Sequence, residues 1–108
     1  MIQHLTVSTR RIYGWRPKLV ATLDDIKHNR LSYSLGTPAV VSRLDTPRGG
    51  FFIIDGHHRV MELILAGHRN INVVIDTELP RIERTGGAHA NILSQKQNVY
   101  EYLTGRAA

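Results

Sequence analysis

The fold is decided by residues 51–67, which read FFIIDGHHRVMELILAG. The apolar residues 51–54 stand between a glycine pair and an Asp-Gly pair, a pattern typical of a strand buried on both faces. Residues 57–66 then repeat apolar side chains at helical spacing, and Gly67 follows as the expected C-terminal cap. The stretch therefore predicts a strand, a tight turn and a helix in direct succession.

Two further strands are predicted on either side of this unit. Residues 39–44 read AVVSRL, are rich in β-formers and follow a Gly-Thr-Pro turn. A loop with Pro and Gly at 45–50 separates them from 51–54, so we expect these two strands to pair as a hairpin. After Gly67, the apolar residues 71–75 predict another buried strand.

Two more helices and one long connection are predicted outside this central unit. Thr22 is followed three residues later by Asp25, which resembles a capping box and predicts a short helix over about 23–30. Apolar side chains at helical spacing predict a closing helix over 91–103. Residues 78–90 contain Pro and Gly-Gly without periodicity, and we expect a connection there that could fold over a site.

Length and composition indicate one ordinary globular domain over residues 1–108. A chain of 108 residues is long enough for one hydrophobic core and too short for two. Its 42% hydrophobic and 21% charged residues are the composition of an ordinary globular protein. The predicted strands and helices give an α+β class, with a mixed sheet and flanking helices. The sequence has no cysteine, which excludes disulfides, thiolate nucleophiles and cysteine-held metal centres.

Hydropathy and charge indicate the compartment and the partners. No apolar stretch approaches the roughly 20 residues that cross a bilayer, and the N-terminus lacks the pattern of a secretory leader. We therefore expect a cytoplasmic protein without a membrane partner. Fourteen Lys and Arg against nine Asp and Glu give a net charge of +5, which favours nucleotides or nucleic acid as partners. A homodimer is compatible with this composition.

The Asp-Gly-His-His-Arg turn carries most of the chemistry that the sequence predicts. A helix N-terminus offers backbone N–H groups and partial positive charge, and Gly56 would let a phosphate approach the backbone closely. His57 and His58 add side-chain donors, and Arg59 can hold a phosphate through two parallel hydrogen bonds. The alternative for Arg59 is a surface pair with Glu62, three residues further along the helix.

Acid/base and metal roles fall on residues around this turn. His58 and Glu62 are one helical turn apart, and they could form a general acid/base pair, metal ligands or an ordinary i,i+4 pair. Asp55 could cap the new helix, hold Mg²⁺ beside a phosphate or orient His58. His57 and His58 diverge by about 100° on a helix, which disfavours a zinc site built on both.

A basic stretch near the N-terminus is the candidate nucleic-acid surface. Tyr13 and Trp15 are interleaved with basic residues there, a combination suited to phosphate contacts and base stacking. Trp15 is the only tryptophan of the sequence, and its alternative role is to fill an edge of the core. The candidate contacts are Arg10, Arg11, Trp15, Arg16 and Lys18.

The turn and its neighbours resemble the ParB/sulfiredoxin-like superfamily. The resemblance covers about residues 38–76 and rests on the strand, the Asp-Gly-His-His-Arg turn, the helix that ends at Gly67 and the strand 71–75. In that family a strand, a Gly-x-x-Arg turn and a helix N-terminus form a site for nucleotide phosphates. The resemblance therefore implies a ParB-like fold, with phosphate contacts from Gly56, His57, His58 and Arg59.

The departures from each branch of the superfamily narrow this expectation. Sulfiredoxins carry a catalytic cysteine where His57 stands, so their reductase chemistry is not expected here. Chromosome-partitioning ParB proteins carry Gly-Glu-Arg-Arg at this turn and continue into further domains, for which a chain of 108 residues has no room. The Asp-Gly-His-His-Arg spelling is more similar to ParB-like free-serine kinases and to ParB-like nuclease and NTPase domains.

The function expected from these residues is phosphate chemistry at the turn. We expect the domain to bind a nucleoside triphosphate with Mg²⁺, or a nucleic-acid phosphate, and to hydrolyse or transfer a phosphoryl group. Arg59 and the helix N-terminus would balance the developing charge, with His58, Glu62 and Asp55 as candidate catalytic residues and Asp55 and Glu62 as candidate metal ligands. Two alternatives are open: a DNA nuclease guided by the basic stretch, and a non-enzymatic module that binds DNA or another partner.

Overall fold

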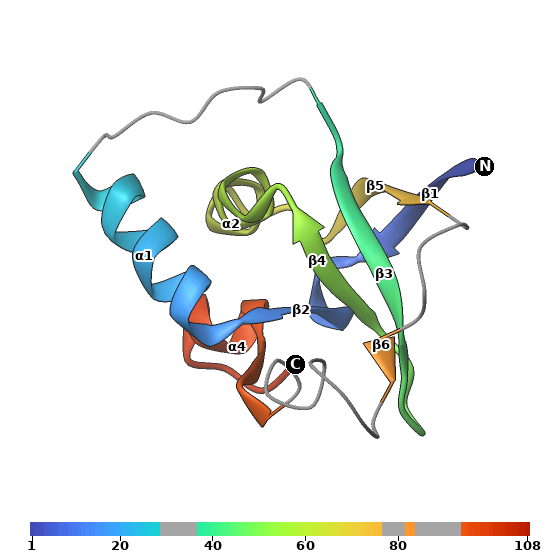
Figure 1. Cartoon of the computed structure of the whole chain (residues 1–108). Helices are drawn as coiled ribbons and strands as arrows, with labels where there is room; N and C mark the ends of the chain where they lie inside the picture. The colour runs from blue at the N-terminus through green and yellow to red at the C-terminus, as the bar shows by residue number, and fades with distance from the viewer. Residues whose placement is uncertain (29–36, 77–81, 84–93) are drawn as a thin grey trace.

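A computed structural model describes residues 1–28, 37–76, 82–83 and 94–108 of the chain (Figure 1). The elements follow in the order β1 (Ile2–Ser8), the 3-10 helix η1 (Thr9–Arg11), β2 (Ile12–Trp15), α1 (Arg16–Lys27), β3 (Ala39–Asp45), β4 (Phe51–Asp55), α2 (His57–Leu65), β5 (Asn70–Asp76), β6 (Ile82–Glu83), β7 (Lys96–Asn98) and α4 (Val99–Thr104). Among the described residues, no helix has the length and apolar character needed to cross a membrane.

The strands form one mixed sheet that supports the helices. Its order is β1-β5-β3-β4-β2-β7, and β6 pairs with the end of β3. β5 and β3 run parallel, as do β4 and β2, whereas β1 with β5, β3 with β4, and β2 with β7 are antiparallel. This arrangement confirms the α+β class with a mixed sheet that the sequence predicts.

The hairpin of β3 and β4 is confirmed at the predicted place. Val41 lies opposite Ile53 and Ser42 opposite Phe52, and the hairpin closes through a hydrogen bond from the Leu44 N–H to the Gly50 oxygen (2.9 Å). The prediction that residues 51–54 are buried on both faces is wrong at one position. Ile54 is 44% exposed, because β4 leaves the packed region there as it approaches the turn.

Helix α2 and strand β5 are also confirmed, and they contribute much of the core. Val60, Met61 and Ile64 are buried on one face of α2, which lies between α1 and the sheet (Figure 1). Gly67 follows the helix with φ +91°, and its N–H donates to the Ile64 oxygen. This is the capping role that the sequence predicts for Gly67.

Helix α1 begins well before its predicted start. The sequence places a helix over 23–30 with Thr22 as its cap, but the helix runs from Arg16 to Lys27 and Thr22 is buried in its interior. Pro17 in the first turn favours this earlier start, since proline is tolerated where the N–H has no helical acceptor. The capping-box assignment is therefore wrong, and residues 29–30 lie outside the described part of the chain.

The closing segment differs from its prediction because its first part joins the sheet. Residues 96–98 form β7 rather than helix and pair with β2, and helix α4 begins only at Val99. Asn98 marks the change, since its Oδ1 accepts from the Glu101 N–H (3.0 Å) and its Nδ2 donates to the Arg10 oxygen (2.8 Å). Residues 91–93 and most of the predicted connection 78–90 lie outside the described residues.

Candidate functional site

The predicted turn joins the end of β4 to the start of α2. Gly56 is the N-cap of α2 with φ 100° and ψ 28°, a left-handed conformation that favours glycine. A Cβ on residue 56 would lie 2.9 Å from both the Cα and the Cβ of Ala39. The first hydrogen bond within α2 runs from the Val60 N–H to the Gly56 oxygen (3.1 Å). The N–H groups of 57–59 thus belong to the anion-favouring first turn.

Asp55 does not take the capping role that the sequence allowed for it. Gly56 occupies the N-cap position and makes no side-chain cap hydrogen bond. Asp55 lies exposed at the end of β4, where it lines two cavities together with Lys18 and His57. Its carboxylate is therefore part of the surface on which a ligand would rest.

His57 is buried beneath the turn and is uncharged at neutral pH. The pKa of His57 is lowered from 6.5 to about 4, mainly by burial and further by the nearby Lys18 ammonium, while the Asp55 carboxylate partly opposes both effects. The side chain is 9% exposed, and its Nε2 has no hydrogen-bond partner among the described residues. His57 can therefore act as a neutral donor or acceptor, but not as a cation for a phosphate.

His58 and Glu62 form the pair that their spacing predicts. The Nε2 of His58 lies 2.9 Å from the Oε1 of Glu62, with side chains 11% and 38% exposed. This contact fixes the orientation of the imidazole ring. Glu62, the residue that the sequence offered as a surface partner for Arg59, contacts His58 in the described structure. The Nε of Arg59 is buried and has no partner among the described residues.

The basic stretch is divided among different parts of the molecule. Trp15 and Lys18 line the cavity beside the turn, and Trp15 is 40% exposed. The other three residues lie over aromatic rings: Arg10 over Tyr100 (4.9 Å), Arg11 over Phe51 (5.5 Å) and Arg16 over Tyr102 (5.9 Å). The fold therefore brings only Trp15 and Lys18 of this set to the predicted phosphate turn.

Two adjoining cavities meet at the turn. The larger cavity has a volume of about 370 Å³ and is lined by Trp15, Lys18, Phe52, Ile53, Ile54, Asp55 and His57. The smaller cavity has a volume of about 110 Å³ and is lined by Lys18, Thr22, Asp25, Asp55, Gly56, His57 and His58. Lys18, Asp55 and His57 belong to both cavities, which therefore form one continuous surface.

Sequence reasoning assigned Lys18 to a nucleic-acid surface and missed that Thr22 and Asp25 of α1 share a site with it. Lys18, Thr22 and Asp25 line the smaller cavity from one helix. Their spacings of i, i+4 and i+7 place them on a single helical face. This signal was present in the sequence, but it becomes readable only when the helix is known to begin at Arg16.

The carboxylates and histidines of the site do not form a metal cage. Among the described residues, no group of three or more His, Cys, Asp or Glu side chains is placed to hold a metal ion. The two metal ligands that the sequence predicts do not face one site. Glu62 contacts His58, whereas Asp55 lines the cavities. Asp55 and Asp25 supply carboxylate oxygens beside the smaller cavity, which suits Mg²⁺ only if other oxygen ligands complete its shell.

Comparison with known proteins does not assign a family. No family model matches the sequence, and no curated protein matches it. A search of solved structures finds the crystal structure of protein Atu1540 from Agrobacterium tumefaciens, with 14% sequence identity and a TM-score of 0.40 over 75% of this chain. The chain spans 44% of the length of that protein. A likeness at this level carries no argument about function.

Proposed function

We propose that this domain binds a nucleoside triphosphate, with its phosphates at the N-terminus of α2 and its base in the larger cavity. The observation that carries the proposal is the junction of the two cavities at Lys18, Asp55 and His57. One cavity is small and opens on a helix N-terminus, and the other is larger and mostly walled by apolar side chains. A nucleotide has the same division, with a compact anionic end and a planar apolar end.

Three sources of positive charge support phosphate binding at the turn. The first turn of α2 adds partial positive charge, Lys18 lines both cavities from α1, and Arg59 stands one residue beyond His58 on the same helix. The buried Arg59 Nε lacks a partner among the described residues, and a buried donor without a partner is costly. A phosphate oxygen bound by Arg59 would remove part of this cost.

The larger cavity suits a nucleobase. Trp15 is 40% exposed and lines the hollow of about 370 Å³ together with Phe52, which is 5% exposed. Stacking on aromatic rings contributes to the binding of any base, because every base has a flat π face. The cavity predicts binding by stacking more than by a specific hydrogen-bond pattern, so we expect more than one base to be accepted.

Mg²⁺ would enter this site with the triphosphate. Asp55 and Asp25 line the smaller cavity, and their charge would repel phosphate unless a cation lies between them. Mg²⁺ usually keeps several waters and binds through one or two carboxylates together with substrate phosphates. The residues present fit this mode, in which Mg²⁺ would supply charge neutralisation at the phosphates.

The His58 and Glu62 pair supports hydrolysis of the bound triphosphate. An imidazole held by a carboxylate can accept the proton of a water as the water oxygen forms a bond to the terminal phosphorus. The bond from phosphorus to the bridging oxygen breaks, and the leaving diphosphate retains that oxygen. Arg59 and the α2 N-terminus would stabilise the charge on the phosphoryl oxygens. This assignment makes Glu62 a positioning residue and not a metal ligand.

A nucleotide panel tests this function against its alternatives. Thermal unfolding is followed with each nucleoside triphosphate, with and without Mg²⁺, alongside phosphate release and plasmid nicking. We expect a rise in Tm and phosphate release with triphosphates, both reduced in Lys18→Ala, since Lys18 lines both cavities, and in Arg59→Ala. Both signals should be retained in Lys27→Ala, an exposed control outside the two cavities and away from the first turn of α2. Nicking without a nucleotide shift would favour the nuclease, and silence in all three assays would favour the binding module.

A further inference from the structure

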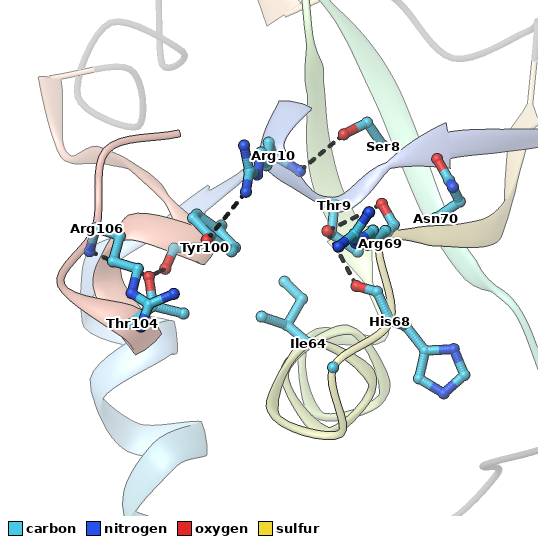
Figure 2. Close-up of a pocket in the computed structure, with 11 residues that line it drawn as sticks. Ser8, Thr9, Arg10, Ile64, His68, Arg69, Asn70, Tyr100, Thr104 and Arg106 are labelled. Atoms are coloured by element: carbon cyan, nitrogen blue, oxygen red, sulfur yellow. Dashed lines mark hydrogen bonds between the residues drawn. The ribbon is translucent and has the colours of Figure 1, made fainter.

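A second basic surface lies at the opposite end of α2. A cavity of about 660 Å³ opens between η1, the residues that follow α2, and α4 (Figure 2). It is far larger than a single phosphate and lies roughly 14 Å from the phosphate turn along the nine-residue helix. It is lined by Ser8, Thr9, Arg10, Ile64, Gly67, His68, Arg69, Asn70, Tyr100, Thr104 and Arg106.

The backbone that carries this cavity is tied together by hydrogen bonds. The Thr9 N–H donates to the Arg69 oxygen (2.9 Å), and the Thr9 hydroxyl contacts the carbonyl oxygens of Arg69 (3.1 Å) and His68 (3.2 Å). On the other wall, the Thr104 hydroxyl donates to the backbone carbonyl oxygen of Tyr100 (2.7 Å). These contacts hold the flanking arginines on defined backbone positions (Figure 2).

The arginines of the cavity are not neutralised by carboxylates in the described part of the chain. No acidic residue among those described lines the cavity. The Arg10 guanidinium contacts Tyr100, both through a hydrogen bond from Nη2 to the hydroxyl (3.3 Å) and by lying over the ring. The C-terminus of α2 adds partial negative charge, which is reduced where the Ile64 and Leu63 carbonyls accept from the N–H groups of Gly67 and His68. The cavity is therefore electropositive and suited to an anion.

A neighbouring cavity extends the same surface. It has a volume of about 230 Å³ and shares Arg10 with the first cavity, and Arg11, Arg48 and Tyr13 also line it. Glu101 is the acidic side chain on this wall, and its Oε1 accepts from the Ala108 N–H (3.0 Å). The arginine surface, as we call it, comprises Arg10, Arg11, Arg48, Arg69 and Arg106.

We propose that the arginine surface binds a single strand of nucleic acid through its backbone phosphates. Several separated guanidiniums along two joined hollows match a polymer with one charge per nucleotide better than a compact anion with its charge at one point. Tyr100 and Tyr13 lie beside the cavities but are already engaged with Arg10 and Lys96. Binding would therefore depend on phosphates and be tolerant of sequence. It goes beyond the nucleotide site, since it uses different residues at the other end of α2.

Fluorescence anisotropy with labelled oligothymidylates of 4, 8 and 12 nucleotides tests this proposal over a range of salt concentrations. We expect affinity to rise with length, and log Kd to depend linearly on log salt. Arg69→Ala should reduce the slope by about 0.7, and the double variant Arg69→Ala/Arg106→Ala by about 1.4, the values for one and two lost phosphate contacts on a single strand. Lys27→Ala removes the same charge elsewhere on the surface and should leave the slope unchanged.

The controls separate a strand from a small polyanion and from net charge alone. Sodium tripolyphosphate should compete only weakly with the 12-nucleotide strand. Equal affinity for all three lengths, or efficient competition by tripolyphosphate, would overturn the proposal in favour of a compact anion. The proposal would also be overturned if Lys27→Ala reduced the affinity and the salt slope as much as Arg69→Ala does, or if the parent protein did not bind the strand at all. Arg59→Ala should retain strand binding, so failure here is distinct from failure of the nucleotide site.

Discussion

Gly56 and Ala39 are in such close contact that a Cβ on residue 56 would lie 2.9 Å from the Cα of Ala39. The glycine of the predicted phosphate turn is thus required by the packing of β3 against the turn, whether or not a ligand is bound. Its left-handed backbone, with φ 100°, adds a second requirement. The sequence argument for Gly56 rested on close approach of a phosphate and on a positive φ at the turn, whereas the contact with Ala39 depends on the pairing of distant segments and could not be predicted.

Gly56→Ala should destabilise the domain more than Gly67→Ala does. Both glycines have positive φ, but a Cβ at Gly67 would meet nothing within 4 Å. The strain of an alanine with positive φ should cost both variants about 1 kcal/mol of stability. The steric overlap of the new Cβ with Ala39 should cost Gly56→Ala roughly 1–3 kcal/mol more. Urea unfolding of the two variants measures the difference. Equal losses in the two variants would show that the contact with Ala39 relaxes without cost.

The stability of the domain should fall with acid because of His57. Its pKa is about 4 in the fold against 6.5 in an unfolded chain, so the unfolded state takes up the proton first as the pH falls. The contribution of the neutral His57 side chain to the free energy of unfolding is complete above about pH 6.5 and is lost progressively as the pH falls toward 4. The loss should reach up to about 3 kcal/mol.

The test compares urea unfolding at pH 7 and pH 4.5 in three proteins. His57→Gln removes the titrating group, so its unfolding free energy should change less between the two pH values than that of the parent. His4→Gln is the control, because His4 is exposed on β1, and it should behave like the parent. An identical acid response in the parent and His57→Gln would mean that His57 is not held neutral by the fold.

Arg59→Ala should weaken triphosphate binding while the domain stays folded. The loss of a hydrogen bond to a charged group is about 1.5–3 kcal/mol, which corresponds to roughly a 10- to 150-fold rise in Kd. The substitution breaks no hydrogen bond of the Arg59 Nε within the described structure, so Tm without ligand should change little. Calorimetric titration measures Kd, with Arg69→Ala as a matched loss of charge. Parent-like affinity in Arg59→Ala would remove it from the site.

His58→Gln and Glu62→Gln should lower triphosphate hydrolysis without abolishing binding. Loss of a general acid/base group costs roughly 100- to 10,000-fold in rate, and loss of the residue that orients it should cost less. Phosphate release at saturating nucleotide gives the rate, and the nucleotide-induced rise in Tm reports binding. Unchanged rates in both variants would mean that the pair, at 2.9 Å, is only an ordinary helical contact.

The parts of the fold that could be predicted from the sequence depend on local signals. The β3–β4 hairpin has β-rich strands on either side of a short Pro- and Gly-containing loop, and α2 has a clear apolar face that ends at Gly67. The contact between His58 and Glu62 follows from helical spacing alone. Neighbours in sequence determine each of these features, so one chain is enough to predict them.

The parts that could not be predicted depend on pairing between distant segments. β1 pairs with β5, and β2 pairs with both β4 and β7, and tertiary context of this kind overrides local preference. Residues 96–98 are strand for this reason, although their spacing fits a helix. The wrong start of α1 had a functional consequence, because it hid the helical face of Lys18, Thr22 and Asp25 that completes the site.

The most direct test of the nucleotide site is an ¹H–¹⁵N correlation spectrum recorded as a nucleoside triphosphate with Mg²⁺ is added. The backbone amides of 56–59 lie at the proposed phosphate position, and the indole N–H of Trp15, the only tryptophan, reports on the larger cavity. We predict saturable shifts at both places, with no comparable shifts around Arg69 and Arg106. Shifts confined to Arg69 and Arg106, or no shifts at the amides of 56–59, would contradict the account.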